Sequence, residues 1–381
     1  MNRKILSILI FMVVANVAMA CRYTVREIGF ADFGKDSYHL VLFDDSRITD
    51  ENAKLFAKIS GAALLDANII VHIINVEKGD TSALLKYYKK YDNNGLPNVI
   101  LVSPEKRAKP FYFNLSGNFS ETVWSVLEKI LTSRARYQLK KNIIKSYGVV
   151  YFIEGKNAKE NVKAREIVDK AVAEIKRIMS SLPKPVNIPP VIITIKADEI
   201  ESEDVLLWSL GWNPADVEKP AVALIYGRGR RMGPLLKGDK IKTDVVRNML
   251  RFIGEDCECG LDRSWMLGTM IPLRWNSKLK AGVLKQYGFD AENPMVISEM
   301  SQILSVAPQQ VNNSINTDLL YGYSENVLAI TDSIKRIEPE PGYSTSESDS
   351  VLNTLIITLL GLLVVIVAGG IIFVRLKNRN S

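Results

Sequence analysis

Hydrophobic and polar residues change along the chain in a pattern that predicts short strands and amphipathic helices in turn. From residue 38 onward, short apolar runs typical of strands are separated by segments with apolar residues at helical spacing. The first group of elements predicts the order β-α-β-α-β-β-α, with strands at 38–43, 69–77, 96–104 and 109–113 and helices at 49–67, 81–95 and 120–133. This part of the chain is therefore expected to be an α/β domain.

The same order of elements returns in the residues that follow. The pattern predicts strands at 149–153, 190–197, 219–227 and 233–236 and helices at 158–182, 202–211 and 243–255. Pro97 and Pro220 precede the third strand of their groups, and Ser120 and Thr243 open the last helices at the same distance from these prolines. One apolar stripe recurs at a constant offset, in which Val123, Val126, Leu127 and Ile130 correspond to Val246, Met249, Leu250 and Ile253. We therefore predict an internal duplication.

This arrangement resembles the thioredoxin-like fold in two tandem copies, over roughly residues 36–260. In that family a proline that is cis stands just before the third strand, the place that Pro97 and Pro220 occupy. Its catalytic members carry Cys-x-x-Cys after the first strand, where this chain reads DDSRITD (44–50) and EGKNAKE (154–160). Without a thiolate at a helix N-terminus there is no activated nucleophile. The resemblance thus implies two non-catalytic copies, which bind polypeptides or act as spacers.

Both ends of the chain carry the pattern of membrane-directed segments. Basic residues near the start, an apolar run at 5–14 and small residues before Cys21 predict a secretory signal peptide, with an uncleaved anchor as the alternative. Residues 355–374 carry no charge and are long enough to span a bilayer, and a basic tail follows them. We expect a single-pass membrane protein whose bulk lies outside the cytoplasm, on the periplasmic or extracellular face.

The domain boundaries follow from these patterns. Beyond the second α/β copy, helices are predicted at 277–288, 294–307 and 324–337, and an acidic Pro/Ser-bearing stretch then leads to the span. The predicted segments are a signal peptide (1–20), thioredoxin-like domain 1 (21–145), thioredoxin-like domain 2 (146–262), a helical region (263–337), a polar stalk (338–352), a transmembrane helix (353–374) and a cytoplasmic tail (375–381).

The net charge and the small number of histidines argue against nucleic-acid binding and against histidine-based chemistry. The net charge of +7 over 381 residues is too small for a dense basic face, so nucleic acid is not expected as a partner. The two histidines, His39 and His72, lie within apolar runs and are interpreted as strand residues with satisfied rings. They offer little material for a histidine-rich metal site or a catalytic triad, and no cofactor is expected.

Three cysteines, Cys21, Cys257 and Cys259, are too few to staple an exported domain of this size. Cys257 and Cys259 fit three interpretations. They could form a strained disulfide with redox or isomerase-like activity, or bind a soft metal such as Cu(I) with Met266 or Met270. They could also be packed thiols or a loop clamp, with one of them bonded to Cys21. Cys21 would become the first residue after signal cleavage, so lipidation there is a further alternative.

Two further segments are candidates for contacts. Arg228, Arg230 and Arg231 fall on a glycine-rich hairpin (226–234) that could grip anionic headgroups or a carboxylate-rich partner, or could be a solvated tip. Residues 264–275 are rich in tryptophan and methionine. They are either an exposed interaction patch or, as we favour, a buried seam between the second copy and the helical region.

These observations together favour a binding or scaffold protein over an enzyme. We expect the exported part of an envelope complex, with envelope or membrane proteins as partners. The strand edges near Pro97 and Pro220 and the arginine hairpin are the candidate contacts. The alternative function is thiol–disulfide or copper handling at Cys257 and Cys259.

Overall fold

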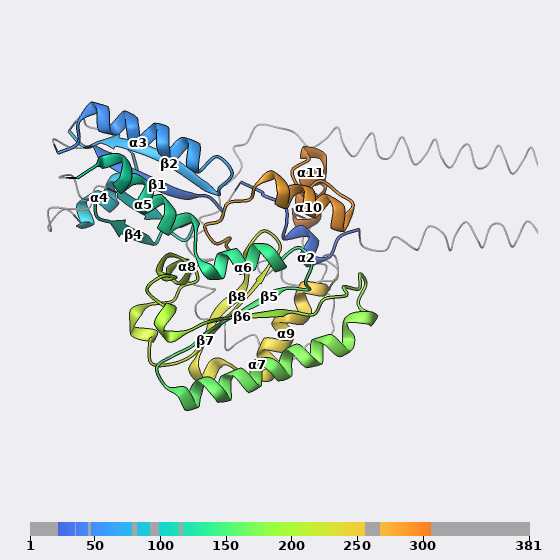
Figure 1. The fold of residues 1–381 in the computed structure, drawn as a ribbon. Coiled ribbons are helices and arrows are strands. Elements are labelled where there is room, and N and C mark those ends of the chain that lie inside the picture. Colours follow the sequence, from blue (N-terminus) through green and yellow to red (C-terminus); the bar gives the residue numbers. More distant parts are fainter. Residues whose placement is uncertain are drawn as a thin grey trace, which may run out of the picture. The chain divides into compact units, whose positions relative to one another are not determined.

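The structure is a computed structural model that describes residues 22–34, 36–44, 47–77, 82–91, 99–113, 117–255 and 267–305 (Figure 1). These residues contain two four-stranded sheets, one from each predicted group of elements. The strand orders are β2-β1-β3-β4 and β6-β5-β7-β8, so the second sheet repeats the first. The predicted tandem α/β arrangement is thereby confirmed. We call residues 38–131 the first domain and residues 149–254 the second domain.

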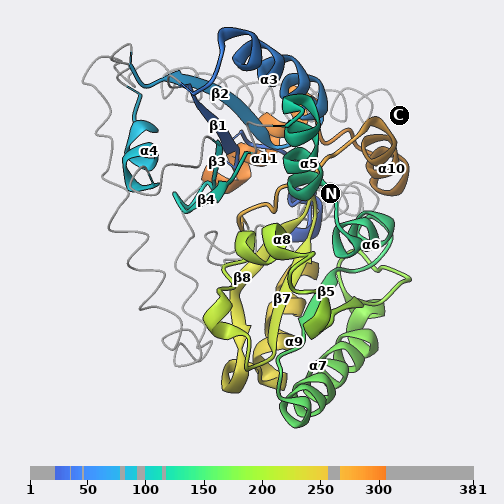
Figure 2. The ribbon, with the colours of Figure 1, turned by 60° about the vertical axis from the view of Figure 1, so that its left-hand side comes forward.

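The first sheet has a parallel half and an antiparallel half. Its strands are β1 (Tyr38–Asp44), β2 (Ile69–Asn75), β3 (Val99–Val102) and β4 (Ala108–Phe111). β1 pairs in parallel with β2 and antiparallel with β3, and β3 pairs antiparallel with β4. Helices α3 (Asp50–Ala63) and α5 (Phe119–Leu131) cover one face, and α4 (Leu85–Tyr91) lies on the other (Figure 2).

Strand alternation explains how β1 serves both faces of this sheet. Leu40 and Leu42 belong to the core shared with α3 and α5, whereas Val41 and Phe43 belong to the core shared with Tyr87 of α4. These four residues of β1 are all fully buried, as expected for a central strand of a sheet covered on both sides.

The second sheet is built in the same way. Its strands are β5 (Val149–Ile153), β6 (Val191–Ile195), β7 (Ala221–Tyr226) and β8 (Arg230–Lys237), and its helices are α7 (Ala158–Ile178), α8 (Asp204–Ser209) and α9 (Thr243–Gly254). α7 and α9 lie side by side across one face (Figures 1 and 2). Short 3₁₀ helices occur at Met179–Ser181, Ala197–Glu199, Pro214–Asp216 and Gly238–Lys240. The repeated apolar stripe of α5 and α9 is buried at all eight positions in the two domains.

Segments outside the two sheets complete the core of the second domain. Ala135 and Leu139 of α6 (Arg134–Asn142) lie in one apolar cluster with Tyr151 of β5. The same cluster includes Phe30, which follows the short helix α2 (Val25–Ile28), and Val283 of α10 (Ser277–Tyr287). The last helix described is α11 (Pro294–Ser305). The sequence pattern did not predict α2 or α6.

The two ends of the described chain lie together. Arg22 Nη1 is 2.6 Å from Glu299 Oε1 of α11, and the Tyr23 hydroxyl donates to Glu299 Oε2 at 3.0 Å. Tyr23 also makes an edge-on ring contact with Phe289. The residue that follows Cys21 is therefore held against the last described helix.

The membrane-directed segments lie outside the described residues. Residues 1–20, the predicted helix at 324–337, the stalk, the span at 353–374 and the tail all remain predictions. Among the residues that the structure does describe, no helix combines the length and apolar character needed to cross a bilayer.

Candidate functional site

The first candidate position is the N-terminus of α3 and of α7, where the thioredoxin-like fold places its redox cysteines. The Thr49 hydroxyl accepts the amide N–H of Asn52 at 3.2 Å at the start of α3. At the start of α7 the Asn157 side chain accepts the amides of Lys159 at 3.1 Å and Glu160 at 3.3 Å. Both are ordinary N-caps. Amides that would stabilise a thiolate there are already occupied by cap side chains.

In the second domain this position is also covered by the chain's own backbone. The carbonyl oxygen of Val217 accepts the amide of Lys156 at 2.9 Å, and that of Glu218 accepts the amide of Asn157 at 3.4 Å. Gly155 lies so close to this loop that a Cβ there would be 2.5 Å from the carbonyl carbon of Lys219. The loop and the start of α7 are thus in direct contact, which leaves no space for a substrate between them.

The prolines before the third strands do not behave as the resemblance implies. Pro97 lies outside the described residues. Pro220 is buried, and since no cis peptide bond occurs in the described residues, the bond before it is trans. The expected cis proline is therefore wrong at this position. The trans form is the lower in free energy by about 0.5–1 kcal/mol for an X–Pro bond, and the loop contacts with α7 are made with the trans bond in place.

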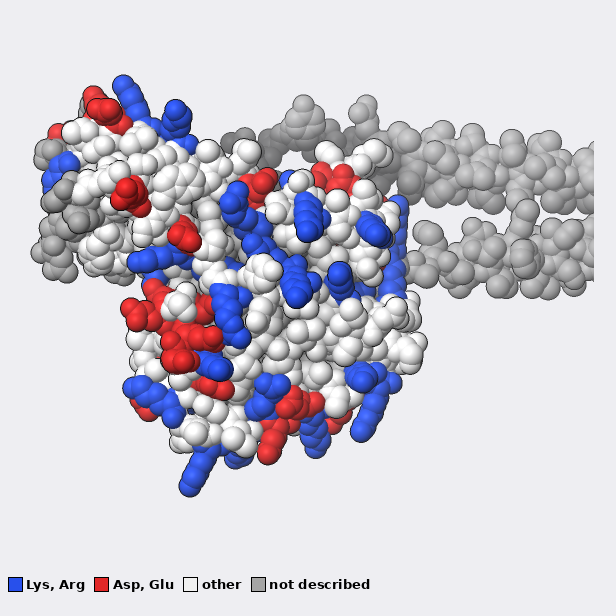
Figure 3. Space-filling model, viewed as in Figure 1, with Lys and Arg blue, Asp and Glu red and all other residues white. Residues whose placement is uncertain are grey.

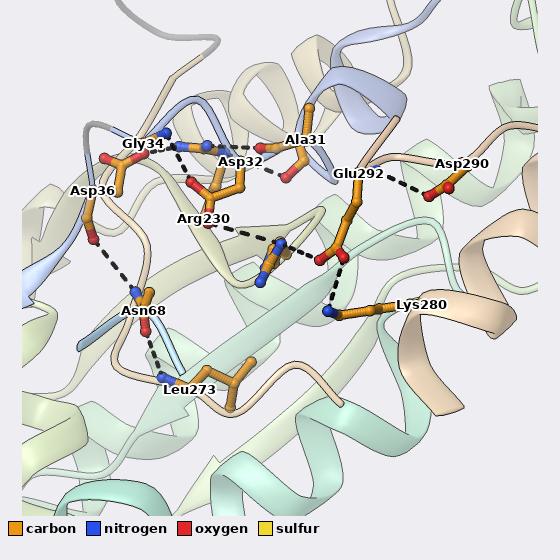
Figure 4. Close-up of polar contacts among 12 residues, drawn as sticks. Ala31, Asp32, Gly34, Asp36, Asn68, Arg230, Leu273, Lys280, Asp290 and Glu292 are labelled. Atoms are coloured by element: carbon orange, nitrogen blue, oxygen red, sulfur yellow. Dashed lines mark hydrogen bonds and ion pairs between the residues drawn. The ribbon is translucent and has the colours of Figure 1, made fainter. Parts of the chain in front are cut away.

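The arginine hairpin is buried rather than solvated. Its tip consists of residues 227–229, and Arg230 lies within β8, which begins earlier than the predicted 233–236. Arg230 is 0% exposed and pairs with Asp36 at 2.6 Å (Figure 4). Its guanidinium also donates to the carbonyl oxygens of Gly29, Ala31 and Gly268. These contacts tie together the segment before β1, the edge strand β8 and residue 268.

Arg228 is engaged in the same way. It is 10% exposed and lies 3.1 Å from Glu292, with its guanidinium over the ring of Trp275. Glu292 also pairs with Lys280 of α10 at 2.8 Å (Figure 4). The alternative of a solvated hairpin tip is wrong, because distant acidic residues and carbonyl groups surround the guanidinium groups of Arg228 and Arg230 inside the fold.

Arg231 joins a polar seam between the two domains. It donates to the carbonyl oxygen of Leu210 at 2.6 Å, and Arg107 donates to the carbonyl oxygens of Trp208 and Ser209. Two cations from different hairpins thus satisfy the C-terminal carbonyls of α8, where the helix dipole is negative.

Glu105 lies between these two arginines. Its carboxylate is 2.7 Å from Arg107 and 3.3 Å from Arg231, and it accepts the hydroxyl of Thr269 at 2.9 Å. Burial alone would raise the pKa of Glu105, but the charges of Arg231 and Arg107 outweigh burial, and the pKa is lowered. The ionised carboxylate is therefore part of the seam.

Residues 267–275 form the remainder of this seam, which confirms the favoured buried interpretation for the described part of 264–275. The four residues of this stretch that are almost fully buried and apolar are Met270, Ile271, Leu273 and Trp275. The Tyr38 hydroxyl donates to the Met270 carbonyl at 3.0 Å. Asn68 donates to the Ile271 carbonyl and accepts the Leu273 amide at 3.0 Å (Figure 4). The segment therefore contacts the first domain as well as the second.

The cysteine interpretations are not tested by the fold. Cys21, Cys257, Cys259 and Met266 lie outside the described residues, and Met270 is 1% exposed. In the described ranges, no three residues of His, Cys, Asp and Glu come together in a group that could hold a metal ion.

Lysine and arginine side chains gather over α6 and α10 (Figure 3). Neither helix contains an acidic residue. The Tyr287 hydroxyl donates to the Ile144 carbonyl at 2.8 Å, so α10 lies against the end of α6. Burial and, after it, the positive charges of Arg274 and Arg136 lower the pKa of Lys140. We give the name basic face to seven basic residues on or beside these two helices: Lys140, Lys141, Lys145, Arg274, Lys278, Lys280 and Lys285.

The chain's two histidines form a pair that sequence reasoning missed. His39 Nδ1 and His72 Nε2 are 2.9 Å apart, and the ring centroids are 5.0 Å apart. β1 and β2 pair in parallel with His39 opposite Ile70 and Val41 opposite His72, so both rings project from the same face of the sheet. Burial lowers the pKa of both histidines, and the charge of His39 lowers that of His72 further. Both strands were predicted, but the pair also depends on their parallel pairing and register.

Comparison with known proteins adds little to this geometry. No known family model and no curated protein sequence matches the chain. Similar solved structures include the first two thioredoxin domains of Saccharomyces cerevisiae Eps1p, with 13% identity over 57% of this chain and 92% of that chain and a TM-score of 0.22. The zinc-bound form of human ERp44 has 8% identity over 62% of this chain and 61% of that chain, with a TM-score of 0.21. The same two domains of Naumovozyma dairenensis Eps1p have 14% identity over 57% and 93%, with a TM-score of 0.20. These likenesses are too low to assign an activity.

Proposed function

We propose that the chain is a membrane-anchored extracytoplasmic scaffold, built on two thioredoxin-like domains that carry out no thiol–disulfide exchange. The observation that carries the proposal is the closed start of α7, where the loop 217–219 accepts the amides of Lys156 and Asn157. The capped start of α3 supports it, since neither position carries a cysteine in the sequence. Without a thiolate at these sites, each domain has only its surfaces with which to act.

The anchoring part of the proposal rests on the signal peptide and the membrane span that the sequence predicts at 1–20 and 353–374. It is supported by the contact between Arg22 and Glu299, because this contact places the residue after Cys21 beside the last described helix. An N-terminal lipid on Cys21 and a C-terminal span would then extend from neighbouring parts of the fold. A scaffold held there would present its remaining surfaces to other envelope proteins.

The basic face is the contact surface that we propose for such a partner. Lys141, Lys278 and Lys285 on it are exposed, and neither of the helices that carry them has an acidic residue. An envelope protein with an acidic surface would be attracted to this face, and screening by salt would weaken the complex. The buried arginines of β8 no longer serve as candidates for this contact.

In-cell photo-crosslinking tests the proposal with the full-length protein. A photoreactive residue at Tyr137, which is exposed on α6, should crosslink to one envelope protein in intact cells. Neutralising Lys141, Lys278 and Lys285 to Gln should reduce this crosslink at least about fivefold, since charge pairs steer association. The matched control neutralises the exposed Lys163, Lys170 and Lys176 on α7 and should leave the crosslink unchanged. Equal crosslinking in both triple variants would refute the basic face as the contact.

A separate assay tests the absence of exchange chemistry. The full-length protein should reduce or isomerise a disulfide-bonded substrate no faster than a variant in which Cys21, Cys257 and Cys259 are Ser. Activity that is lost in Cys257→Ser and Cys259→Ser, with folding intact, would instead support the redox function at this pair.

A further inference from the structure

We infer that His39 and His72 form a binding site for a divalent transition-metal ion with square-planar or octahedral coordination, Cu²⁺ or Ni²⁺, with water at its remaining positions. The inference is independent of the proposed scaffold function, because it rests on β1 and β2 of the first domain, whereas that function rests on α6, α7 and α10. Its basis is the spacing of two imidazole nitrogens on a rigid pair of strands.

The distance between the nitrogens fits this coordination geometry. Imidazole nitrogen binds such metals at about 2.0–2.1 Å, so two nitrogens at a right angle around one ion are about 2.9 Å apart. The observed separation of His39 Nδ1 and His72 Nε2 is 2.9 Å. Tetrahedral coordination would require about 3.4 Å at the same bond lengths. In the metal-free fold this separation is that of a hydrogen bond between the rings, and a bound ion would take the place of the shared proton. Square-planar sites with nitrogen ligands are typical of Cu²⁺ and Ni²⁺.

The sheet holds the two rings in place before any ion arrives. β1 is hydrogen-bonded to β2 on one side and to β3 on the other, which fixes the positions of both backbones. Val41 and Ile74, next along the strands on the same face, are buried in the apolar cluster with α4. Ile70 is 47% exposed, so the face opens to solvent beside the histidines. An ion can enter from this side and retain water ligands.

The protonation state of the pair suits metal binding. Only neutral imidazole is a ligand. The hydrogen bond between His39 Nδ1 and His72 Nε2 requires that one of these two nitrogens accepts and so carries no proton. Within the described residues, no third histidine, cysteine or carboxylate joins them, so the site keeps open positions for water or for an exogenous ligand.

Copper titration of the full-length protein in detergent tests the site, with all three cysteines alkylated so that no thiol competes. One Cu²⁺ per chain should bind at pH 7.5, and its electron spin echo envelope should show two equatorial imidazoles. His39→Gln or His72→Gln should weaken binding at least about tenfold and leave the signal of one imidazole, and the double variant should lose both. Ni²⁺ should follow the same order.

Ile70→Ser provides the matched control, because Ile70 is exposed and lies on the same face of β2 as His72. This variant should bind Cu²⁺ as the unchanged protein does. The double histidine variant should retain its far-ultraviolet circular dichroism. Cu²⁺ binding that persists in the double variant, or an echo signal without two imidazoles in the unchanged protein, would overturn the inference.

Discussion

Arg230 in β8 and Asp36 before β1 form an ion pair of 2.6 Å in which the arginine side chain is completely buried. The same guanidinium donates to the carbonyls of Gly29, Ala31 and Gly268. One side chain of the second domain thus holds the segment that leads into the first sheet and the segment that follows α9. The pair is a structural joint of the two-domain fold.

Arg230→Ala should reduce the free energy of unfolding by about 3–5 kcal/mol, because it leaves the Asp36 carboxylate without its cation and removes one donor from each of three carbonyl groups. The matched control is Arg251→Ala, since the Arg251 side chain is 63% exposed and pairs with Glu255 only on the surface of α9. This control should cost less than about 1 kcal/mol. Urea denaturation of the full-length protein measures both values. A loss for Arg230 as small as that for Arg251 would contradict the role of the joint.

The polar seam should depend on the charge of Glu105. Its pKa is lowered in the fold, so the unfolded chain takes up a proton on this carboxyl more readily than the folded chain does. The stabilisation is therefore present above the ordinary value of 4.5 and is lost as the pH falls through the lowered pKa of the fold. Glu105→Gln should destabilise the protein by about 1–3 kcal/mol at pH 7, and the difference from the unchanged protein should vanish in strong acid.

Thermal unfolding from pH 7 to pH 3 measures this difference. Glu51→Gln is the control, because Glu51 is exposed in the first turn of α3, away from the seam. A difference between Glu105→Gln and the unchanged protein that stays constant over the whole range would show that the carboxylate charge does not support the seam.

Local pattern accounts for most strands and helices, and it fails where partners are distant. The apolar stripes of α5 and α9 are visible in the sequence because each is a property of one helix. By contrast, α6 has the sequence RARYQLKKN, whose polar residues hide the small apolar face formed by Ala135 and Leu139. The burial of Arg230 depends on Asp36, which is 194 residues away, and no local signal marks a buried arginine.

The histidine pair could be predicted from the sequence only in part. Both strands were predicted, but the pair also requires that β1 and β2 run in parallel with His39 two positions before the level of His72. Register is set by the packing of whole faces, so a single sequence does not specify it. The closed start of α7 was not predictable either, because it depends on the approach of Gly155 to a loop that is far along the chain.

Acid should destabilise the metal-free protein through the pair of His39 and His72. The pKa values of His39 and His72 are lowered in the fold, so the unfolded chain binds protons first as the pH falls below the ordinary 6.5. The free energy of unfolding should therefore be independent of these groups above about pH 7.5 and should decline below 6.5. Replacement of both histidines by Gln should remove this part of the decline. Urea denaturation between pH 7.5 and 5 in the presence of a chelator checks it, and equal slopes in the two proteins would refute it.

The contact between Gly155 and Lys219 gives a direct test of the closed helix start. In Gly155→Ala the new Cβ would be 2.5 Å from the carbonyl carbon of Lys219, so the loop must move away from α7. We expect a loss of about 1–3 kcal/mol in the free energy of unfolding and faster hydrogen exchange at the amides of Lys156 and Asn157.

The matched control is Gly61→Ala in α3, where a Cβ meets nothing within 4 Å. This control should instead gain about 0.5–1 kcal/mol, because alanine loses less conformational freedom than glycine in a helix. Because the opened site still has no cysteine, Gly155→Ala should acquire no disulfide exchange activity. Unchanged exchange rates at Lys156 and Asn157 would mean that the contact between the loop and the start of α7 does not require glycine at residue 155.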